Sequence, residues 1–276
     1  MNRRKDHISA RQLGALAVTA AGLPIFRICC RLSWNWVLLG AVAAAGTLSA
    51  MTAVVQRRRS AGKQPGPGNA VLLPLLLLAA LMAAWESAFA FPETAGSWLA
   101  AAIVLGLSAA AAWIGPAAAG RCAGILLWTT GALYGIVLVL SMPQIRLEWI
   151  APAGTYLDAV KVWAALLLPG AALCLAPALG EDQQLPHWPW WVAAALAVAA
   201  SIVTAGILSP ALARESEAFR TLARGVSVLG VIRRFEALVN GAMLMSGFSL
   251  CALLLTAMTA VFRSVKNFFK KRRKKC

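Results

Sequence analysis

Eight long apolar stretches occupy most of this 276-residue chain, and they constrain its fold more than any motif does. About 20 consecutive apolar residues suffice to carry a helix across the hydrocarbon core of a bilayer. Backbone polar groups find no hydrogen-bond partner in lipid, so such stretches must form helices. Since 60% of the residues are hydrophobic and only 13% are charged, the sequence predicts an all-α, polytopic membrane bundle of about eight transmembrane helices.

Most of the charged residues lie between the apolar stretches, and they separate one predicted span from the next. The expected spans are Leu13–Cys30, Leu32–Gln56, Ala70–Phe91, Trp98–Ala119, Ala123–Met142, Val160–Leu179, Trp190–Leu212 and Leu238–Phe262. We expect residues 1–262 to form a single transmembrane domain and residues 263–276 to form a basic cytoplasmic tail. Arg3, Arg4 and Lys5 precede the first stretch as they would in a secretory signal peptide. The seven spans that follow favour a retained first helix over a cleaved signal.

Lys and Arg residues set the expected orientation, because cytoplasmic loops of membrane proteins are enriched in them. With the N-terminus inside, the inner segments carry 17 Lys and Arg residues and the outer segments carry 9. The sequence therefore predicts cytoplasmic N- and C-termini. The same asymmetry accounts for the net charge of +16, so we expect no nucleic-acid partner.

The C-terminal tail is the most basic segment of the chain. Its central cations are Lys270, Lys271, Arg272 and Arg273. Such a cluster just inside a last span attracts anionic lipid by about 1 kcal/mol per charge. The tail is thus predicted either to bind the anionic lipid membrane or to act as a plain stop-transfer anchor, and both interpretations stay open.

Glu86 is the acidic residue placed deepest in a predicted span, four to six residues before its outer end. An ionisable group at membrane depth is a functional candidate by default. The alternative is a side chain that snorkels toward the outer interface, near Glu93.

Helix breakers mark two spans, the first and the sixth. Gly22 and Pro24 lie in the first, and Pro169 and Gly170 lie in the sixth. Transporters with inverted repeats place discontinuous helices at corresponding positions in their two halves and bind substrate there. This spacing predicts two helix breaks around one mid-membrane site for a small zwitterion, although Gly and Pro are common in membrane helices in general.

A short amphipathic helix is expected before the last span. Phe219, Leu222, Val226 and Leu229 recur at helical spacing with charged residues between them. The alternative is a basic loop on the outer face.

Enzymatic chemistry has no support in the sequence. No acid–base pair or nucleophile constellation stands out, and neither the two His nor the six Cys residues show metal-ligand spacing. We therefore expect a protein that is not an enzyme and that needs no cofactor or metal.

Several short segments resemble the spore germination permeases (GerAB type), the B-subunits of germinant receptors in the amino acid–polyamine–organocation transporter superfamily. Ile8 to Gln12 resembles the family's opening I-S-x-x-Q, and Ala88 to Trp98 resembles its L-P-x-T-P-x-W signature. Met142 to Pro152 resembles the stretch after its fifth helix. These matches occur in the family's order along the chain.

Two further segments extend the resemblance toward the C-terminus. Gly115 followed by Arg121 resembles an inner turn of the family. Phe219 to Gly247 resembles its outer loop and eighth helix, and Glu236 falls on the acidic position of the motif R-x-[DE]-A-L. The resemblance thus covers nearly the whole chain.

The chain also departs from the family pattern. The family usually has ten helices, Gly22-Leu23 stands where it has Gly-Thr, and the Pro expected after Thr94 is missing. The resemblance therefore implies an inverted-repeat amino acid permease truncated to about eight helices.

The function that the resemblance implies is nutrient sensing at the inner membrane of a spore. The chain would bind a small nutrient, such as an amino acid, and would pass the signal to A-type and C-type receptor subunits. Two alternatives remain, namely an active transporter of amino acids or other small solutes, and a degenerate scaffold that binds no ligand.

Overall fold

The computed structural model describes residues 9–60, 71–88, 96–150, 154–175, 186–208, 218–225 and 235–273. Helices dominate these residues, and no strand occurs in them. The long helices are α1 (Ala10–Arg27), α2 (Trp34–Ser60), α3 (Leu72–Ala88), α4 (Gly96–Ile114), α5 (Pro116–Ser141), α6 (Tyr156–Leu175), α7 (Trp188–Ile207) and α9 (Phe235–Arg273). Short 3-10 turns lie at Cys29–Arg31 (η2), Met142–Gln144 (η4) and Leu147–Trp149 (η5).

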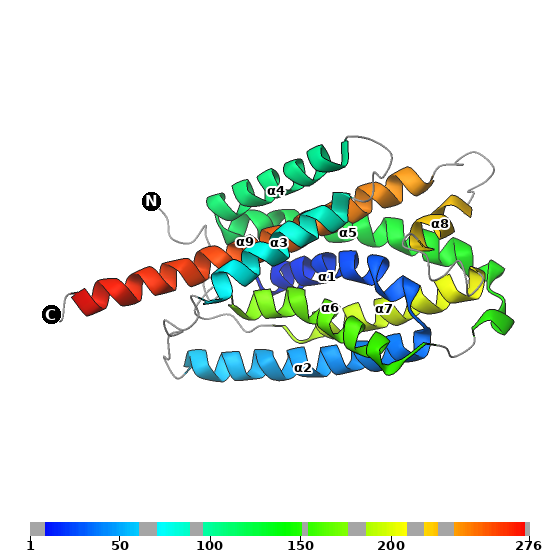
Figure 1. Cartoon of the computed structure of the whole chain (residues 1–276), viewed down its shortest axis with the longest axis horizontal. Helices are drawn as coiled ribbons and strands as arrows, with labels where there is room; N and C mark the ends of the chain where they lie inside the picture. The colour runs from blue at the N-terminus through cyan, green and yellow to red at the C-terminus, as the bar shows by residue number, and fades with distance from the viewer. Residues whose placement is uncertain are drawn as a thin grey trace.

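The helices form one bundle in which successive long helices run in opposite directions (Figure 1). Within the described ranges, seven helices are long and apolar enough to cross a membrane, and α3 is a shorter apolar helix of 17 residues. The prediction of a polytopic helical membrane bundle is confirmed. Each expected span corresponds to one helix. Two ends differ clearly from the prediction, because α5 already begins at Pro116 rather than at Ala123 and α9 continues past Phe262 to Arg273.

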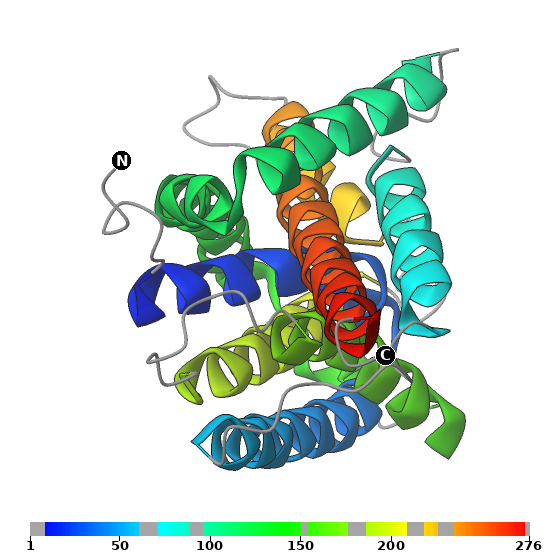
Figure 2. The same ribbon diagram turned by 90° about the vertical axis from the view of Figure 1, so that its left-hand side faces the viewer.

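Helices α1 and α9 occupy the centre of the bundle, as the end-on view in Figure 2 shows for α9. We compared the most apolar stretch of 18 residues in each helix. In α1, 89% of this stretch is buried inside the bundle, and in α9 72% is buried, against 17% in α4. Small residues allow the close approach of neighbouring helices that membrane bundles depend on. Gly247 of α9, for example, lies directly against Ser87 of α3.

Local sequence explains where several helices begin. Ser9 and Gln12 form a capping box at the start of α1, since the Ser9 Oγ accepts from the Gln12 N–H at 3.2 Å and Gln12 Oε1 accepts from the Ser9 N–H at 3.0 Å. The I-S-x-x-Q segment thus has a structural role here. Between α4 and α5, Gly115 has φ +122°, a conformation that side chains disfavour, and Pro116 follows at the first position of α5.

The expected amphipathic helix is present as α8 (Ala218–Gly225). Phe219 and Leu222 are buried, so the helix packs into the end of the bundle. The predicted apolar positions Val226 and Leu229 lie outside the described residues.

The two ends of the bundle differ in charge. We call the end where α1 begins and α9 ends the basic end, and the opposite end the α8 end (Figure 1). All described Asp and Glu residues lie at the α8 end, namely Glu86, Glu148, Asp158 and Glu236. The described cations near the basic end therefore have no carboxylate beside them among the residues that the structure places.

Candidate functional site

Three aromatic side chains meet near the α8 end of the bundle. The ring of Phe26 in α1 lies 3.8 Å from that of Tyr134 in α5 and 4.2 Å from that of Phe219 in α8, measured between centroids. All three side chains are buried. Such ring pairs add about 0.5–1.5 kcal/mol each beyond the apolar area they bury. The cluster joins three helices that are far apart in sequence.

A buried pair of hydroxyl groups lies beside these rings. Tyr134 Oη is 3.3 Å from the Oγ of Ser246 in α9. A Cβ added at Gly22 would lie 2.8 Å from that Ser246 Oγ and 3.5 Å from Tyr134 Cε2. Gly22 therefore lets α1 approach α9 and α5 closely, and the space where a side chain would stand is already filled.

Glu86 pairs with Arg27, the last residue of α1. Its Oε2 accepts from Arg27 Nε at 3.2 Å and from Arg27 Nη2 at 3.0 Å. The Arg27 side chain is 14% exposed and that of Glu86 is 45% exposed. The carboxylate is thus neutralised by a specific partner and is still reachable from outside the bundle.

Glu236, at the start of α9, holds α8 in place. Its carboxylate accepts from the Nε and Nη2 of Arg224 at 2.7 and 2.9 Å, and Arg220 Nε donates to the same group. Arg220 is nearly buried, whereas the Arg224 side chain is 51% exposed. One carboxylate therefore fixes two successive turns of α8.

These two ion-pair systems lie at the same end of the bundle, where the ring of Phe26 also touches that of Phe219. We call Arg27, Glu86, Arg220, Arg224 and Glu236 the α8-end cluster. The buried Asn240 lies one helical turn after Glu236, and its Oδ1 has no hydrogen-bond partner in the described structure. The cluster thus presents both signs of charge and an unsatisfied buried acceptor.

Helices α1 and α6 are both continuous, so the prediction of two helix breaks is wrong. Pro24 lies inside α1 and Pro169 lies inside α6. A proline removes one backbone N–H, but neighbouring helices in a membrane bundle allow the helix to continue past it. The freed N–H groups expected for carboxylate binding are therefore not provided by broken helices.

The two Gly-Pro segments also lie at different depths. Gly22 and Gly170 each stand five residues before the end of their helix, but α1 ends at the α8 end and α6 ends at the basic end. A Cβ at Gly170 would meet the side chain of Leu48 in α2. The structure thus brings Gly22, Pro24 and Glu86 to one end and places Pro169 and Gly170 toward the other.

The basic tail is an extension of α9, which continues past Phe262 to Arg273. The helix has 39 residues and a length of roughly 58 Å at 1.5 Å per residue. It therefore exceeds the hydrocarbon core of about 30 Å and projects from the basic end (Figure 1). The side chains of Lys270, Lys271, Arg272 and Arg273 lie outside what the structure describes.

Sequence reasoning did not single out Arg27, Tyr134, Ser246 or Asn240. Each is a polar residue in or at the end of an apolar helix, and only the fold shows which of them share neighbours. Glu236 did carry a signal, since it falls on the acidic position of the R-x-[DE]-A-L motif.

Comparison with known proteins adds no family assignment. No protein-family model matches the chain, and a search of curated proteins gave no match.

Proposed function

We propose that this chain is a permease-like membrane subunit of a spore germinant receptor that senses a small zwitterionic nutrient, such as an amino acid, at the α8-end cluster. The observation that carries the proposal is the placement of Arg27 and Glu86, a pair of opposite charges that is partly exposed at the end of the bundle. A zwitterion offers the same two charges. Its carboxylate can take the place of Glu86 beside Arg27, and its ammonium can pair with Glu86.

The surroundings of the pair suit a small ligand. The buried aromatic rings of Phe26, Tyr134 and Phe219 lie at the same end of the bundle, and an apolar surrounding of this kind strengthens charge interactions. Asn240 Oδ1 is a buried acceptor that an ammonium group can satisfy. Both features lie at the end of the bundle that holds the ion pair, and they support a binding site there.

The proposed arrangement in the spore inner membrane follows the charge of the two ends. The basic end faces the cytoplasm together with both termini, in agreement with the positive-inside rule. The α8-end cluster then faces outward, where nutrients arrive. Binding that separates Arg27 from Glu86 breaks the ion pair that links the end of α1 to α3, and A-type and C-type subunits would read that change.

The proposal is tested by ligand-induced thermal stabilisation of the purified chain in lipid nanodiscs with a panel of amino acids. Glu86→Gln should abolish stabilisation by the amino acid that stabilises the wild type. Asp158→Asn is the matched control, because Asp158 forms a carboxylate–cation pair at the same end with Lys161, at 2.9 Å. Equal responses of the two variants would rule out the site.

A measurement of substrate uptake distinguishes an active transporter from a sensor. Uptake of the stabilising amino acid into proteoliposomes should stay at the level of empty vesicles if the chain senses without transporting. Concentrative uptake would assign it to the active transporters.

A scaffold that binds no ligand is the second candidate, and one observation favours it. Side chains of neighbouring helices fill the space beside both Gly22 and Gly170, so neither glycine opens a cavity. This candidate predicts that no amino acid or sugar stabilises the wild-type chain.

A further inference from the structure

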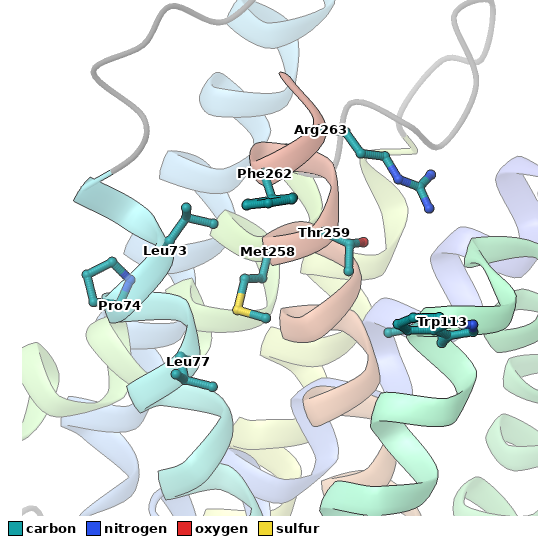
Figure 3. Close-up of a pocket in the computed structure, with 9 residues that line it drawn as sticks. Leu73, Pro74, Leu77, Trp113, Met258, Thr259, Phe262 and Arg263 are labelled. Carbon is teal, nitrogen blue, oxygen red and sulfur yellow. The ribbon is translucent and has the colours of Figure 1, made fainter. Parts of the chain in front are cut away.

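An open apolar groove runs between α3, α4 and α9 near the basic end of the bundle (Figure 3). Its volume is about 610 Å³. Leu73 and Leu77 of α3 form one wall, Trp113 of α4 forms the other, and Met258 and Phe262 of α9 lie between them. The groove is far from the α8-end cluster along the bundle axis, because these residues stand at the start of α3 and at the end of α4.

One cation stands at this groove. Arg263 of α9 belongs to its lining and is exposed, and Figure 3 shows its side chain above Trp113, beyond the apolar residues. Arg263 makes no ion pair within the described part of the chain, and no described carboxylate lies at this end. The groove therefore combines a long apolar surface with one positive charge that has no counter-charge among the described residues.

The groove lies where α3 begins and α4 ends, as expected for a site at the boundary between hydrocarbon and headgroups. Trp113 is the penultimate residue of α4 and is 89% exposed, and Trp is enriched at this depth in membrane proteins. Basic pockets between transmembrane helices bind the headgroups of anionic lipids. An occupant that carries an acyl chain and a phosphate satisfies both the apolar walls and Arg263.

We propose that this groove binds one anionic phospholipid from the leaflet at the basic end, with an acyl chain between α3 and α4 and its phosphate beside Arg263. The site differs from attraction of lipid by the basic tail, because it depends on shape as well as charge. A substitution that fills the groove without changing any charge should therefore abolish phospholipid binding at this site.

The test measures binding of phosphatidylglycerol and phosphatidylcholine to the full-length, delipidated chain by native mass spectrometry. We expect one phosphatidylglycerol to bind more tightly than phosphatidylcholine. Leu77→Trp should abolish this tight binding by filling the groove. Leu75→Trp is the matched control, since Leu75 is an exposed residue of the same helix that does not line the groove.

A second pair of variants tests the charge. Arg263→Gln should lower the affinity of the groove for phosphatidylglycerol about fivefold, as expected for the loss of one cation near the membrane surface. Arg57→Gln should leave it unchanged, because Arg57 is an exposed cation near the same end on α2, on the other side of the bundle from α4 (Figure 2).

Three outcomes would overturn the proposal. They are equal affinity for the two lipids, equal effects of Leu77→Trp and Leu75→Trp, and equal effects of Arg263→Gln and Arg57→Gln. Loss of a copurified polypeptide in Leu77→Trp, with lipid binding unchanged, would instead assign the groove to a helix of a partner protein.

Discussion

Glu236→Gln is the most informative single substitution for the packing of the α8 end. Gln keeps the shape of the side chain and removes its charge. Glu236 accepts hydrogen bonds from two guanidinium groups, those of Arg220 and Arg224. The structure thus predicts that α8 loses its main polar attachment to α9.

The magnitude follows from the kind of hydrogen bond that is lost. A hydrogen bond between two charged groups contributes about 1.5–3 kcal/mol, and a neutral one contributes about 1 kcal/mol. Replacing the carboxylate by an amide therefore costs about 1 kcal/mol for each of the two arginines, or about 2 kcal/mol in the free energy of unfolding. Arg224→Gln should cost less, because that side chain is 51% exposed and Arg220 still neutralises Glu236.

Equilibrium unfolding of the full chain in mixed micelles, followed by tryptophan fluorescence, measures this loss. Asp158→Asn is again the control, since its partner Lys161 is 62% exposed and the pair should contribute no more than about 1 kcal/mol. Faster hydrogen exchange in residues 218–225 should accompany the loss in Glu236→Gln alone. If Glu236→Gln costs no more than Asp158→Asn, the carboxylate of Glu236 does not anchor α8.

Three further predictions concern the helix contacts and the basic end. Gly22→Leu should destabilise the chain by about 1–3 kcal/mol, because its side chain would collide with Ser246; an unchanged unfolding free energy would contradict the close approach of α1 and α9. A C-terminal reporter that is active only outside the cytoplasm should stay silent, and strong activity would reverse the proposed orientation. Replacing four tail cations by Gln should weaken binding of a tail peptide to phosphatidylglycerol vesicles by about 1 kcal/mol per charge at low salt, and binding that ignores charge and salt would exclude the electrostatic interpretation. These cations are Lys270, Lys271, Arg272 and Arg273.

The number and position of the long helices were predictable from the sequence. The length of an apolar stretch decides whether it can cross a bilayer, and this length is a local property of the chain. The short helix α8 was predictable for a similar reason, since the spacing of Phe219 and Leu222 already shows its apolar face. The capping box of Ser9 and Gln12 likewise involves residues three positions apart.

Only the tertiary structure decided which residues meet. Glu86 and Gly22 were candidates for separate reasons, and the fold brings both to the α8 end through Arg27 and α1. It places Pro169 and Gly170 toward the opposite end, because α6 runs antiparallel to α1. Partners such as Arg27 for Glu86, or Ser246 for Gly22, depend on the rotation and depth of two helices at once. Hydropathy does not fix the rotation, because lipid accepts an apolar helix in any rotation and only packing against its neighbours selects one.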